Sequence, residues 1–217
     1  KAIAREYFMI NKGEEQRAHL IMKLRGQGIR SASVLSAIES VPRDIFIENA
    51  LKNHAWENVT LPIGEGQTIS QPYIVALMTT ALNLSGKEIV LEIGTGSGYQ
   101  ASILSLLCRR VYTIERIKTL HEFSNKKFKE LKLNNITTKF GNGSLGWPEV
   151  SPFDRIILTC AINQIPKQLF LQLKIGGILI GPEILEDSSQ VLSSYYQTDK
   201  NKFEKKKIED VKFVPML

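Results

Sequence analysis

The stretch IVLEIGTGSGYQ, residues 89–100, decides the fold. Its first five residues are mostly apolar and branched, which is typical of a strand buried in a parallel sheet. Gly94, Gly96 and Gly98 then form a turn whose backbone can approach a ligand closely, because no Cβ intervenes. From Tyr99 the pattern continues as an amphipathic helix. A strand, a glycine turn and a helix N-terminus together predict a site of nucleotide size.

The spacing of the glycines indicates which kind of nucleotide binds. It is GxGxG, whereas a pyrophosphate cofactor calls for GxGxxG. Glu92 stands two residues before the first glycine, where a carboxylate repels a diphosphate and attracts a cation. This favours S-adenosylmethionine, whose sulfonium and amino groups are positive and which has no phosphate. A tight turn between strand and helix with no ligand at all has the same appearance, so that alternative stays open at this point.

A second strand supports the ligand-binding interpretation. The run RVYTIE, residues 110–115, is rich in β-branched residues and ends in a carboxylate. Glu115 lies 21 positions after Gly94, the spacing at which an acidic residue reaches the ribose hydroxyls of a bound nucleotide. Two acceptor oxygens suit a vicinal diol. A glutamate at a strand end is often simply exposed to solvent. That interpretation is less favoured here, because Glu115 follows a glycine turn at this distance.

Composition places the chain among ordinary globular proteins. It has 217 residues, of which 43% are hydrophobic and 23% charged. We expect one compact unit, with a helical extension at 1–60 and a cofactor-binding catalytic domain at 61–217. There is no stretch of about 20 apolar residues and no signal-peptide pattern. Cys108 and Cys160 lack CxxC spacing and fit a reducing compartment, so we expect a cytoplasmic protein. We also expect it to act as a monomer.

The net charge of +6 leaves an acidic partner open. Much of that charge lies at residues 200–207, KNKFEKKK, which we interpret as the solvated face of a late hairpin. We therefore expect no nucleic-acid partner and no membrane partner.

The pattern along the chain predicts an α/β fold. Helices are expected at 14–25 and at 33–41, where Pro42 ends the second one. From about residue 87, strand and helix patterns alternate, which predicts a doubly wound, mostly parallel sheet with helices on both faces. The alternating segments are 89–93, 99–108, 110–115, 117–131, 137–140, 154–159, 167–174 and 177–181. Strands at 190–197, 203–209 and 211–216 are predicted to add an antiparallel edge.

The segment LPIGEGQTISQP, residues 61–72, reads as a polar loop leading into a helix that begins at Pro72. Gln67, Thr68 and Ser70 place three uncharged polar side chains together. Its length and polarity also suit a lid that hydrogen-bonds a substrate carboxylate without protonating it.

These residues carry a resemblance to a known family. LPIGEGQTISQPY followed by VLEIGTGSGYQ resembles the protein-L-isoaspartate O-methyltransferases, and the match extends from about Glu14 to Leu217. Further segments in the family's order are RGQGI (25–29), VPRDIFI (41–47), IERI (114–117), GNGSLGW (141–147), PFDRIILT (152–159) and VKFVPML (211–217). The TIS loop is specific to this family, whereas the GxGxG turn is shared by most class I methyltransferases, which have a Rossmann-like fold. The resemblance implies a repair enzyme that methylates the α-carboxylate of L-isoaspartyl residues with S-adenosylmethionine.

The resemblance also implies roles for individual residues. Ser70 and Thr68 are the implied catalytic hydroxyls, and Val214, Pro215 and Leu217 approach the substrate. The implied cofactor-binding residues are Gln67, Thr68, Ile69, Ser70, Glu92, Gly94, Gly96, Ser97, Gly98, Glu115, Arg116, Asn142 and Gly143.

The chain departs from the family pattern at two places. Asn142 replaces the usual aspartate, so its bond to the adenine amino group lacks charge. Residues 159–166, TCAINQIP, are bulkier than the usual segment and would narrow the substrate entrance.

The implied chemistry asks little of the protein. A carboxylate has a pKa near 4 and is already an ionised nucleophile at neutral pH, so neither a general base nor a metal is required. His19, His54 and His121 are scattered, and we interpret each as structural or exposed. Ser70 is therefore interpreted as an orienting donor, the alternative being a helix N-cap before Pro72.

Two other functions remain open from the sequence. An RNA-base methyltransferase is favoured by the basic charge, but it would need an aromatic platform or a basic stripe beside the cofactor. Residues 61–72 have neither. The other is a protein that binds the cofactor without catalysis, and the replacement of the usual aspartate by Asn142 is the one feature that favours it.

Overall fold

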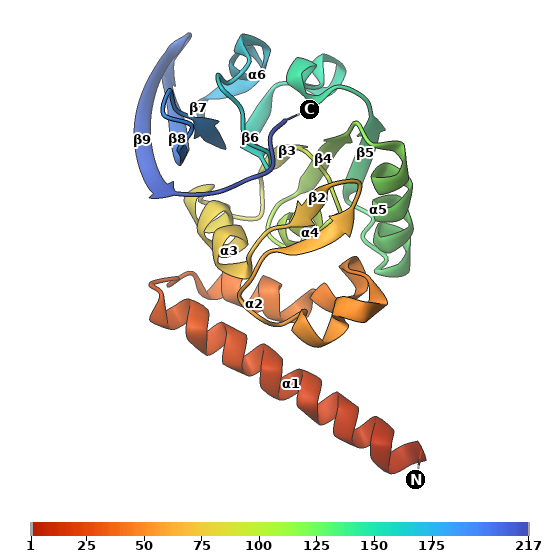
Figure 1. The fold of residues 1–217 in the computed structure, drawn as a ribbon. Coiled ribbons are helices and arrows are strands. Elements are labelled where there is room, and N and C mark those ends of the chain that lie inside the picture. The colour runs from red at the N-terminus through yellow and green to blue at the C-terminus, as the bar shows by residue number, and fades with distance from the viewer. Residues whose placement is uncertain (1, 217) are drawn as a thin grey trace.

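The computed structural model describes the backbone of residues 2–216 and the side chains of residues 13–216. A seven-stranded sheet forms its centre, with the strand order β5–β4–β3–β6–β7–β8–β9 (Figure 1). The first five of these run parallel to one another, and β8 and β9 are antiparallel additions. The strands of the sheet are β3 (Ile89–Ile93), β4 (Arg110–Glu115), β5 (Ile136–Phe140), β6 (Phe153–Leu158), β7 (Leu173–Ile184), β8 (Gln190–Asp199) and β9 (Lys202–Asp210). The predicted α/β fold with a doubly wound, mostly parallel sheet and an antiparallel edge is confirmed.

Helices flank this sheet and precede it in the chain. They are α1 (Ala2–Gly26), α2 (Ala32–Ser40), α3 (Pro72–Ala81), α4 (Tyr99–Ser105), α5 (Lys118–Glu130) and α6 (Lys167–Leu171), with short 3₁₀ helices η1 (Arg43–Phe46), η2 (Asn49–His54), η3 (Gly143–Leu145) and η4 (Pro148–Val150). The predicted helix at 167–174 is shorter than expected, because Leu173 already begins β7. Within the described chain, no helix is both long and apolar enough to cross a bilayer.

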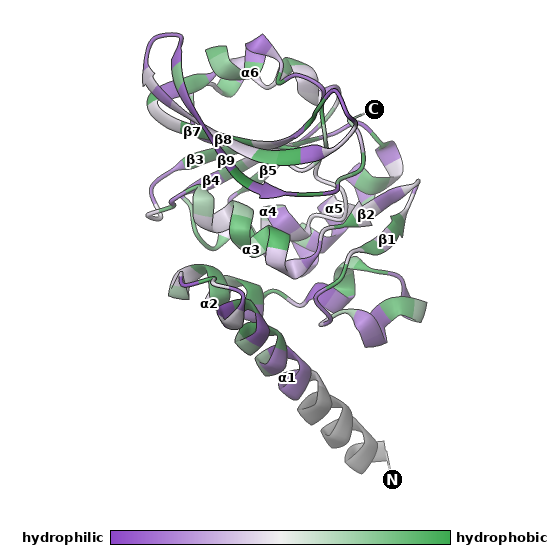
Figure 2. Cartoon of the chain, turned by 60° about the vertical axis from the view of Figure 1, so that its left-hand side comes forward, coloured by the Kyte–Doolittle hydropathy of each residue, from purple (hydrophilic) through white to green (hydrophobic). Residues whose placement is uncertain are grey.

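Alternating side chains of the central strands form a core on each face of the sheet. Val90 and Ile157 pack with residues of α3, α4 and α5 on one face. Leu91 and Ile156 pack with Leu169 of α6 on the other. Figure 2 shows hydrophobic residues concentrated on the central strands and on α3. Because side chains alternate across a strand, both faces of each central strand are buried, as the apolar runs predict.

A third cluster joins the N-terminal helices to the sheet domain. Leu24 of α1, Ile38 of α2 and Phe46 of η1 are all almost completely buried. They share one cluster with Val75 of α3 and Tyr99 of α4. The helices before residue 60 are therefore anchored on α3 and on α4, which begins directly after the glycine turn.

Candidate functional site

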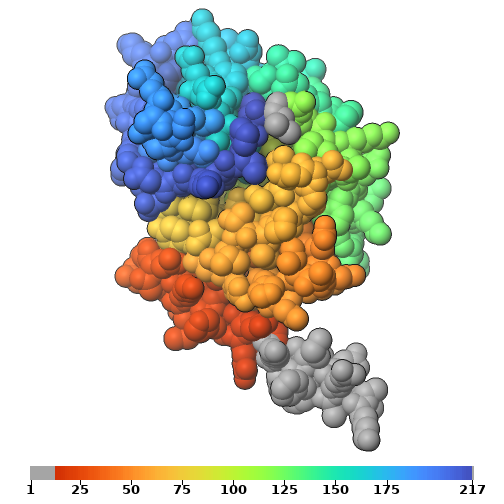
Figure 3. All heavy atoms as spheres, viewed as in Figure 1, coloured from red at the N-terminus to blue at the C-terminus, as the bar shows by residue number. Residues whose placement is uncertain are grey.

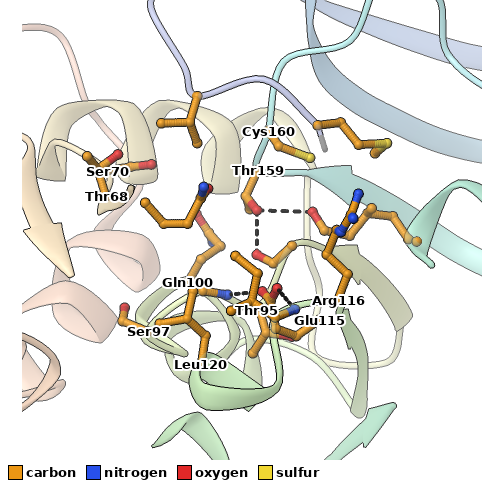
Figure 4. A pocket seen from close by; sticks show the side chains of 18 of the residues that line it. Thr68, Ser70, Thr95, Ser97, Gln100, Glu115, Arg116, Leu120, Thr159 and Cys160 are labelled. Carbon is orange, nitrogen blue, oxygen red and sulfur yellow. Dashed lines mark hydrogen bonds between the residues drawn. The ribbon is translucent and has the colours of Figure 1, made fainter. Parts of the chain in front are cut away.

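A pocket opens at the carboxyl ends of the parallel strands (Figure 4). It encloses about 850 Å³ of space, with the open solvent at its mouth included. β3 lies between β4 and β6. After β3 the chain builds β4 and β5 on one side of it, and it then crosses over to build β6 and β7 on the other side. Ligands of open α/β sheets bind at this switch point. The lining consists of residues 67–70, Val75, 93–97, 99–100, 114–117, Leu120, 142–143, 159–160 and 214–216.

Most of the residues singled out from the sequence meet in this pocket. Those that line it are Gln67, Thr68, Ile69, Ser70, Gly94, Gly96, Ser97, Glu115, Arg116, Asn142, Gly143, Val214 and Pro215. Glu92 and Gly98 are not in the lining. Leu217 lies outside the described residues.

The glycine turn follows β3 directly, as the sequence predicts. Gly94 has a φ of +95°, and a Cβ built on it would stand 2.5 Å from the Thr159 hydroxyl oxygen. That hydroxyl donates to the carbonyl of Ile93 at 3.0 Å and also to the carbonyl of Gly94. A side chain at position 94 would therefore displace either the turn or Thr159.

Glu115 holds the turn from the neighbouring strand. Its side chain is only 5% exposed, and its two carboxylate oxygens accept bonds from the backbone N–H groups of Gly96 and Ile117, both at 2.8 Å. Each carboxylate oxygen can accept a further bond. The Glu115 carboxylate is thus fixed at the pocket wall with acceptor capacity left for a diol.

Glu92 lies beneath the pocket. It is completely buried and accepts a short hydrogen bond from the Thr113 hydroxyl, which accepts in turn from Thr95 at 2.6 Å. Its other oxygen has no partner among the described atoms. Burial raises the pKa of Glu92 to about 8, an effect that the nearby Glu115 charge increases and the Thr113 bond reduces. Glu92 therefore supports the turn from below and does not reach the pocket with its side chain.

Residues 61–69 form a β-hairpin, whereas the sequence predicts a loop. β1 (Leu61–Gly64) pairs with β2 (Gln67–Ile69) through a two-residue turn at Glu65 and Gly66, which both have positive φ. This is the arrangement of a type I′ turn. The strands are so short that their period of two is not visible in the sequence.

Ser70 lies between β2 and α3. The N-cap of α3 is Gln71, and no side chain caps the helix there. The alternative of Ser70 as a helix cap is therefore not supported. No hydroxyl bond of Ser70 or Thr68 occurs among the described residues, and Figure 4 shows both side chains on the side of the pocket away from Arg116.

The C-terminal segment, residues 211–216, contributes Val214, Pro215 and Met216 to the pocket lining. The predicted strand here is wrong, since the segment makes only a single bridge, between Pro215 and Ala161. The backbone N–H of Phe213 donates to Oε1 of Gln190 at 2.6 Å, and the Gln190 amide donates to the Phe213 carbonyl at 3.1 Å. Figure 3 shows this dark-blue segment lying against the orange and yellow residues of the hairpin and α3. Residues 211–216 do not extend the sheet, because they are bonded to the Gln190 side chain and to the loop that contains Ala161.

A groove adjoins the pocket on this side. It shares Thr68, Ser70, Thr159 and Val214 with the pocket and continues along the C-terminal segment and residues 188–190. An extended peptide placed in this groove would reach the pocket at the hydroxyls of Thr68 and Ser70.

Several lining residues escaped the sequence analysis. Thr95, Gln100, Leu120 and Met216 line the pocket, and Gln100 is held by a 2.9 Å bond to Thr79. The only sequence signal of Thr95, Gln100 and Leu120 is their place just after a strand or in the first turn of a helix.

Cys160, placed at the end of β6, also lines the pocket. Burial raises the pKa of its thiol to about 12, so it is a neutral wall group and not a nucleophile.

Comparisons with known proteins agree with this geometry. A family model described as protein-L-isoaspartate(D-aspartate) O-methyltransferase (PCMT) matches residues 15–217. A protein-L-isoaspartate O-methyltransferase from Parvibaculum lavamentivorans is 54% identical over 173 residues, covering 80% of this chain and 78% of that protein. One from Dictyoglomus thermophilum is 48% identical over 204 residues, covering 94% of this chain and 91% of that protein.

Solved structures are similar as well. A protein-L-isoaspartate O-methyltransferase superposes with a TM-score of 0.85 at 27% identity, covering 92% of this chain and 65% of that chain. A Plasmodium falciparum structure, described as a β-aspartate methyltransferase (PCMT) in complex with S-adenosyl-L-homocysteine, superposes with a TM-score of 0.80 at 25% identity. That match covers 92% of this chain and 97% of the other.

Proposed function

The chain belongs to the protein-L-isoaspartate(D-aspartate) O-methyltransferase family, and from this premise we propose which of its residues carry the reaction. The reaction moves a methyl group from S-adenosylmethionine to the α-carboxylate of an L-isoaspartyl residue in a damaged protein or peptide. The observation that carries the assignment is one pocket with a fixed carboxylate, Glu115, on one wall and two uncommitted hydroxyls, Thr68 and Ser70, on another.

The cofactor fits the wall formed by the ends of β3, β4 and β5. S-adenosylmethionine supplies an activated methyl group on a positively charged sulfur. We propose that Glu115 accepts bonds from the ribose hydroxyls and that Arg116, Asn142 and Gly143 border the adenine. The glycine turn, with Ser97, borders the methionine part.

Two predicted cofactor contacts take an indirect form in this proposal. Glu92 acts through Thr113 and Thr95, which hold the turn from below. Gly98 acts through close packing, because a Cβ there would stand 2.8 Å from the ring of Phe128.

The substrate carboxylate fits the opposite wall. We propose that the Ser70 hydroxyl, with Thr68 beside it, donates to this carboxylate and aims one oxygen at the methyl group. The flanking peptide then lies in the groove beside Val214 and Pro215. Since the carboxylate is ionised at neutral pH, no residue needs to remove a proton. The work of the protein is alignment of the two reactants and exclusion of water.

We further propose that the protein works as a monomer in the cytoplasm, with residues 1–60 as a helical extension of the catalytic domain at 61–217. Cys108 and Cys160 are unbonded thiols, which suits a reducing compartment. Nucleic acid is not an expected partner, because three of the four lysines of β9 are paired with carboxylates. The pairs are Lys202–Asp199, Lys205–Glu183 and Lys207–Asp210.

Transfer of a labelled methyl group from S-adenosylmethionine to an isoaspartyl peptide tests the proposed function. The matched control is the same peptide with a normal aspartyl residue. We expect base-labile label on the isoaspartyl peptide alone. Equal labelling of both peptides, or labelling of RNA in place of peptide, would contradict the proposal.

A further inference from the structure

Arg43 of η1 is a buried cation outside the pocket lining. Its side chain is 0% exposed. Within the part of the chain whose side chains are described, it forms no ion pair with a carboxylate. Burying an unpaired charge is costly unless hydrogen bonds compensate it. The contacts that Arg43 makes therefore indicate what it is there to hold.

Three backbone carbonyls surround the guanidinium. Its Nη1 donates to Ala55 at 2.7 Å, and its Nη2 donates to Val59 and to Ser70, both at 3.0 Å. The guanidinium also lies over the ring of Tyr99, 5.7 Å from the centroid. Burial lowers the pKa of Arg43 to about 10, which leaves it charged at neutral pH. One side chain thus ties the N-terminal region to the end of the hairpin strand β2.

The bond to Ser70 matters because Ser70 has few other anchors. The residue lies between a three-residue strand and the first turn of α3, and its hydroxyl has no partner among the described residues. Holding its carbonyl fixes the peptide plane that follows Ser70. That plane, with the paired strand before it, determines the direction of the Cα–Cβ bond and so the position from which the hydroxyl extends.

We propose that Arg43 is a positioning residue for Ser70, holding the hydroxyl in the direction that orients the substrate carboxylate. This inference rests on the proposed function, because it assigns Ser70 to the substrate. Arg43 does not touch either reactant. Its planar guanidinium spans three carbonyls at once, which a lysine ammonium cannot reproduce even though it keeps the charge.

Arg155 of β6 offers a matched control. It also donates to three backbone carbonyls, those of Leu82 at 2.5 Å, Asp154 at 2.8 Å and Asn83 at 3.2 Å. These contacts lie at the amino end of β6 and do not involve the pocket lining. Arg155→Lys therefore removes arginine–carbonyl bonds of the same type without touching Ser70.

The experiment compares Arg43→Lys and Arg155→Lys with the wild type. It measures kcat and KM for an isoaspartyl peptide, the affinity for S-adenosylhomocysteine by calorimetry, and Tm. The calorimetric stoichiometry counts binding-competent molecules, so kcat is expressed per competent enzyme. We expect Arg43→Lys to lower kcat/KM about tenfold, equivalent to about 1.4 kcal/mol, with cofactor affinity within about twofold of wild type. Arg155→Lys should leave kcat/KM unchanged, and its only effect should be a lower Tm.

A double variant tests whether the effect passes through Ser70. In a Ser70→Ala background, Arg43→Lys should have little further effect on kcat/KM. Full additivity would overturn the proposal. So would an unchanged kcat/KM in Arg43→Lys, an equal fall in Arg155→Lys, or the absence of any competent fraction, since Arg43 would then serve folding alone.

Failure of the proposed function has a different signature. Wild-type enzyme would not methylate the isoaspartyl peptide, or Ser70→Ala would not slow it. Neither result depends on Arg43.

Discussion

The two walls of the pocket are built in different ways. The wall that we assign to the cofactor, the cofactor wall, is formed by the ends of β3, β4 and β5, which are neighbouring strands in one sheet. The wall that we assign to the substrate, the substrate wall, is formed by residues 67–70 and 211–216, two segments outside that sheet. On the first wall Glu115 is bonded to the backbone of its own and the adjacent strand end. On the second, Ser70 and Phe213 are held by the side chains of Arg43 and Gln190, which are distant in sequence.

This difference separates the two tasks of the enzyme. The cofactor wall is stiff because ladder hydrogen bonds and close packing define it. The substrate wall has only short backbone pairings, of β1 with β2 and of Pro215 with Ala161, and the side-chain bonds of Arg43 and Gln190 add to them. A single substitution should therefore shift it without disturbing the cofactor. Variants of the first wall should therefore change cofactor affinity, and variants of the second should change turnover of the peptide.

The largest effect is expected for Gly94→Ala on the cofactor wall. A Cβ at this position would stand 2.5 Å from the Thr159 hydroxyl oxygen, and φ is +95°. We expect S-adenosylhomocysteine binding to weaken by about a hundredfold or more, equivalent to about 2.7 kcal/mol. Calorimetry measures this directly.

Gly86→Ala is the matched control for this variant. Gly86 has a φ of +90°, but nothing lies within 4 Å of its added Cβ. It should lower Tm through backbone strain and leave cofactor affinity unchanged. Equal losses of affinity in both variants would mean that strain, and not crowding of the turn, is responsible.

Ser70→Ala is expected to have the next largest effect, confined to the substrate. Losing one donor to a charged group costs about 1.5–3 kcal/mol, so kcat/KM should fall about ten- to a hundredfold. Cofactor affinity should stay nearly intact. Measuring kcat/KM and Tm on one preparation checks this, and a lowered Tm with unchanged kcat/KM would defeat the assignment.

Glu92→Gln tests whether Glu92 supports the cofactor wall from below. Burial raises the pKa of Glu92 to about 8, above the ordinary value of 4.5. The folded protein then binds an extra proton between these values, and the resulting stability is lost as pH rises through about 8. Glutamine does not titrate, so the fall in Tm between pH 6 and pH 9 should shrink by about 3 °C or more in the variant. An unchanged pH profile would contradict this, as would a large loss of cofactor affinity, which would make Glu92 a direct ligand.

The cofactor wall was also the more predictable of the two from the sequence. The bounds 89–93 and 110–115 match β3 and β4, because buried parallel strands leave an apolar, β-branched run between clear turn residues. Glu115 was found through its spacing from Gly94. Both signals are local in the chain, and the parallel sheet brings them together without further information.

The substrate wall was less predictable because long-range contacts define it. The hairpin at 61–69 has a turn at Glu65, a residue type that rarely adopts positive φ. The segment 211–216 has the alternation of a strand, but the Gln190 side chain takes the backbone groups of Phe213 that a sheet neighbour would pair. Arg43 was noticed only as part of a family motif, since nothing local indicates that it reaches Ser70.

Gln190→Ala should loosen the substrate wall. It removes both bonds to the Phe213 backbone, at 2.6 and 3.1 Å. At about 1 kcal/mol for the net loss, peptide KM should rise roughly fivefold, with a smaller change in cofactor affinity. Gln190→Glu keeps the acceptor but sets a carboxylate oxygen against the Phe213 carbonyl, so it should raise KM at least as much as Gln190→Ala. Equal KM values for all three enzymes would show that this contact does not hold the segment.

Asn142→Asp should give the smallest change. Asn142 caps η3 by accepting from the Ser144 N–H at 2.9 Å, which aspartate can also do. A charged acceptor for the adenine amino group adds roughly 1 kcal/mol, so S-adenosylhomocysteine should bind about fivefold more tightly. Calorimetry showing no change, or weaker binding, would mean that the Asn142 side chain does not contact adenine.

The central claim is that one pocket presents its two reactants from these two walls, and a crystal structure with S-adenosylhomocysteine and an isoaspartyl peptide tests it most directly. We predict the ribose hydroxyls within about 2.5–3.2 Å of the Glu115 carboxylate, and the peptide α-carboxylate within the same range of the Ser70 hydroxyl, facing the sulfur. A peptide carboxylate bound away from residues 67–70, or a ribose bound away from Glu115, would contradict the account.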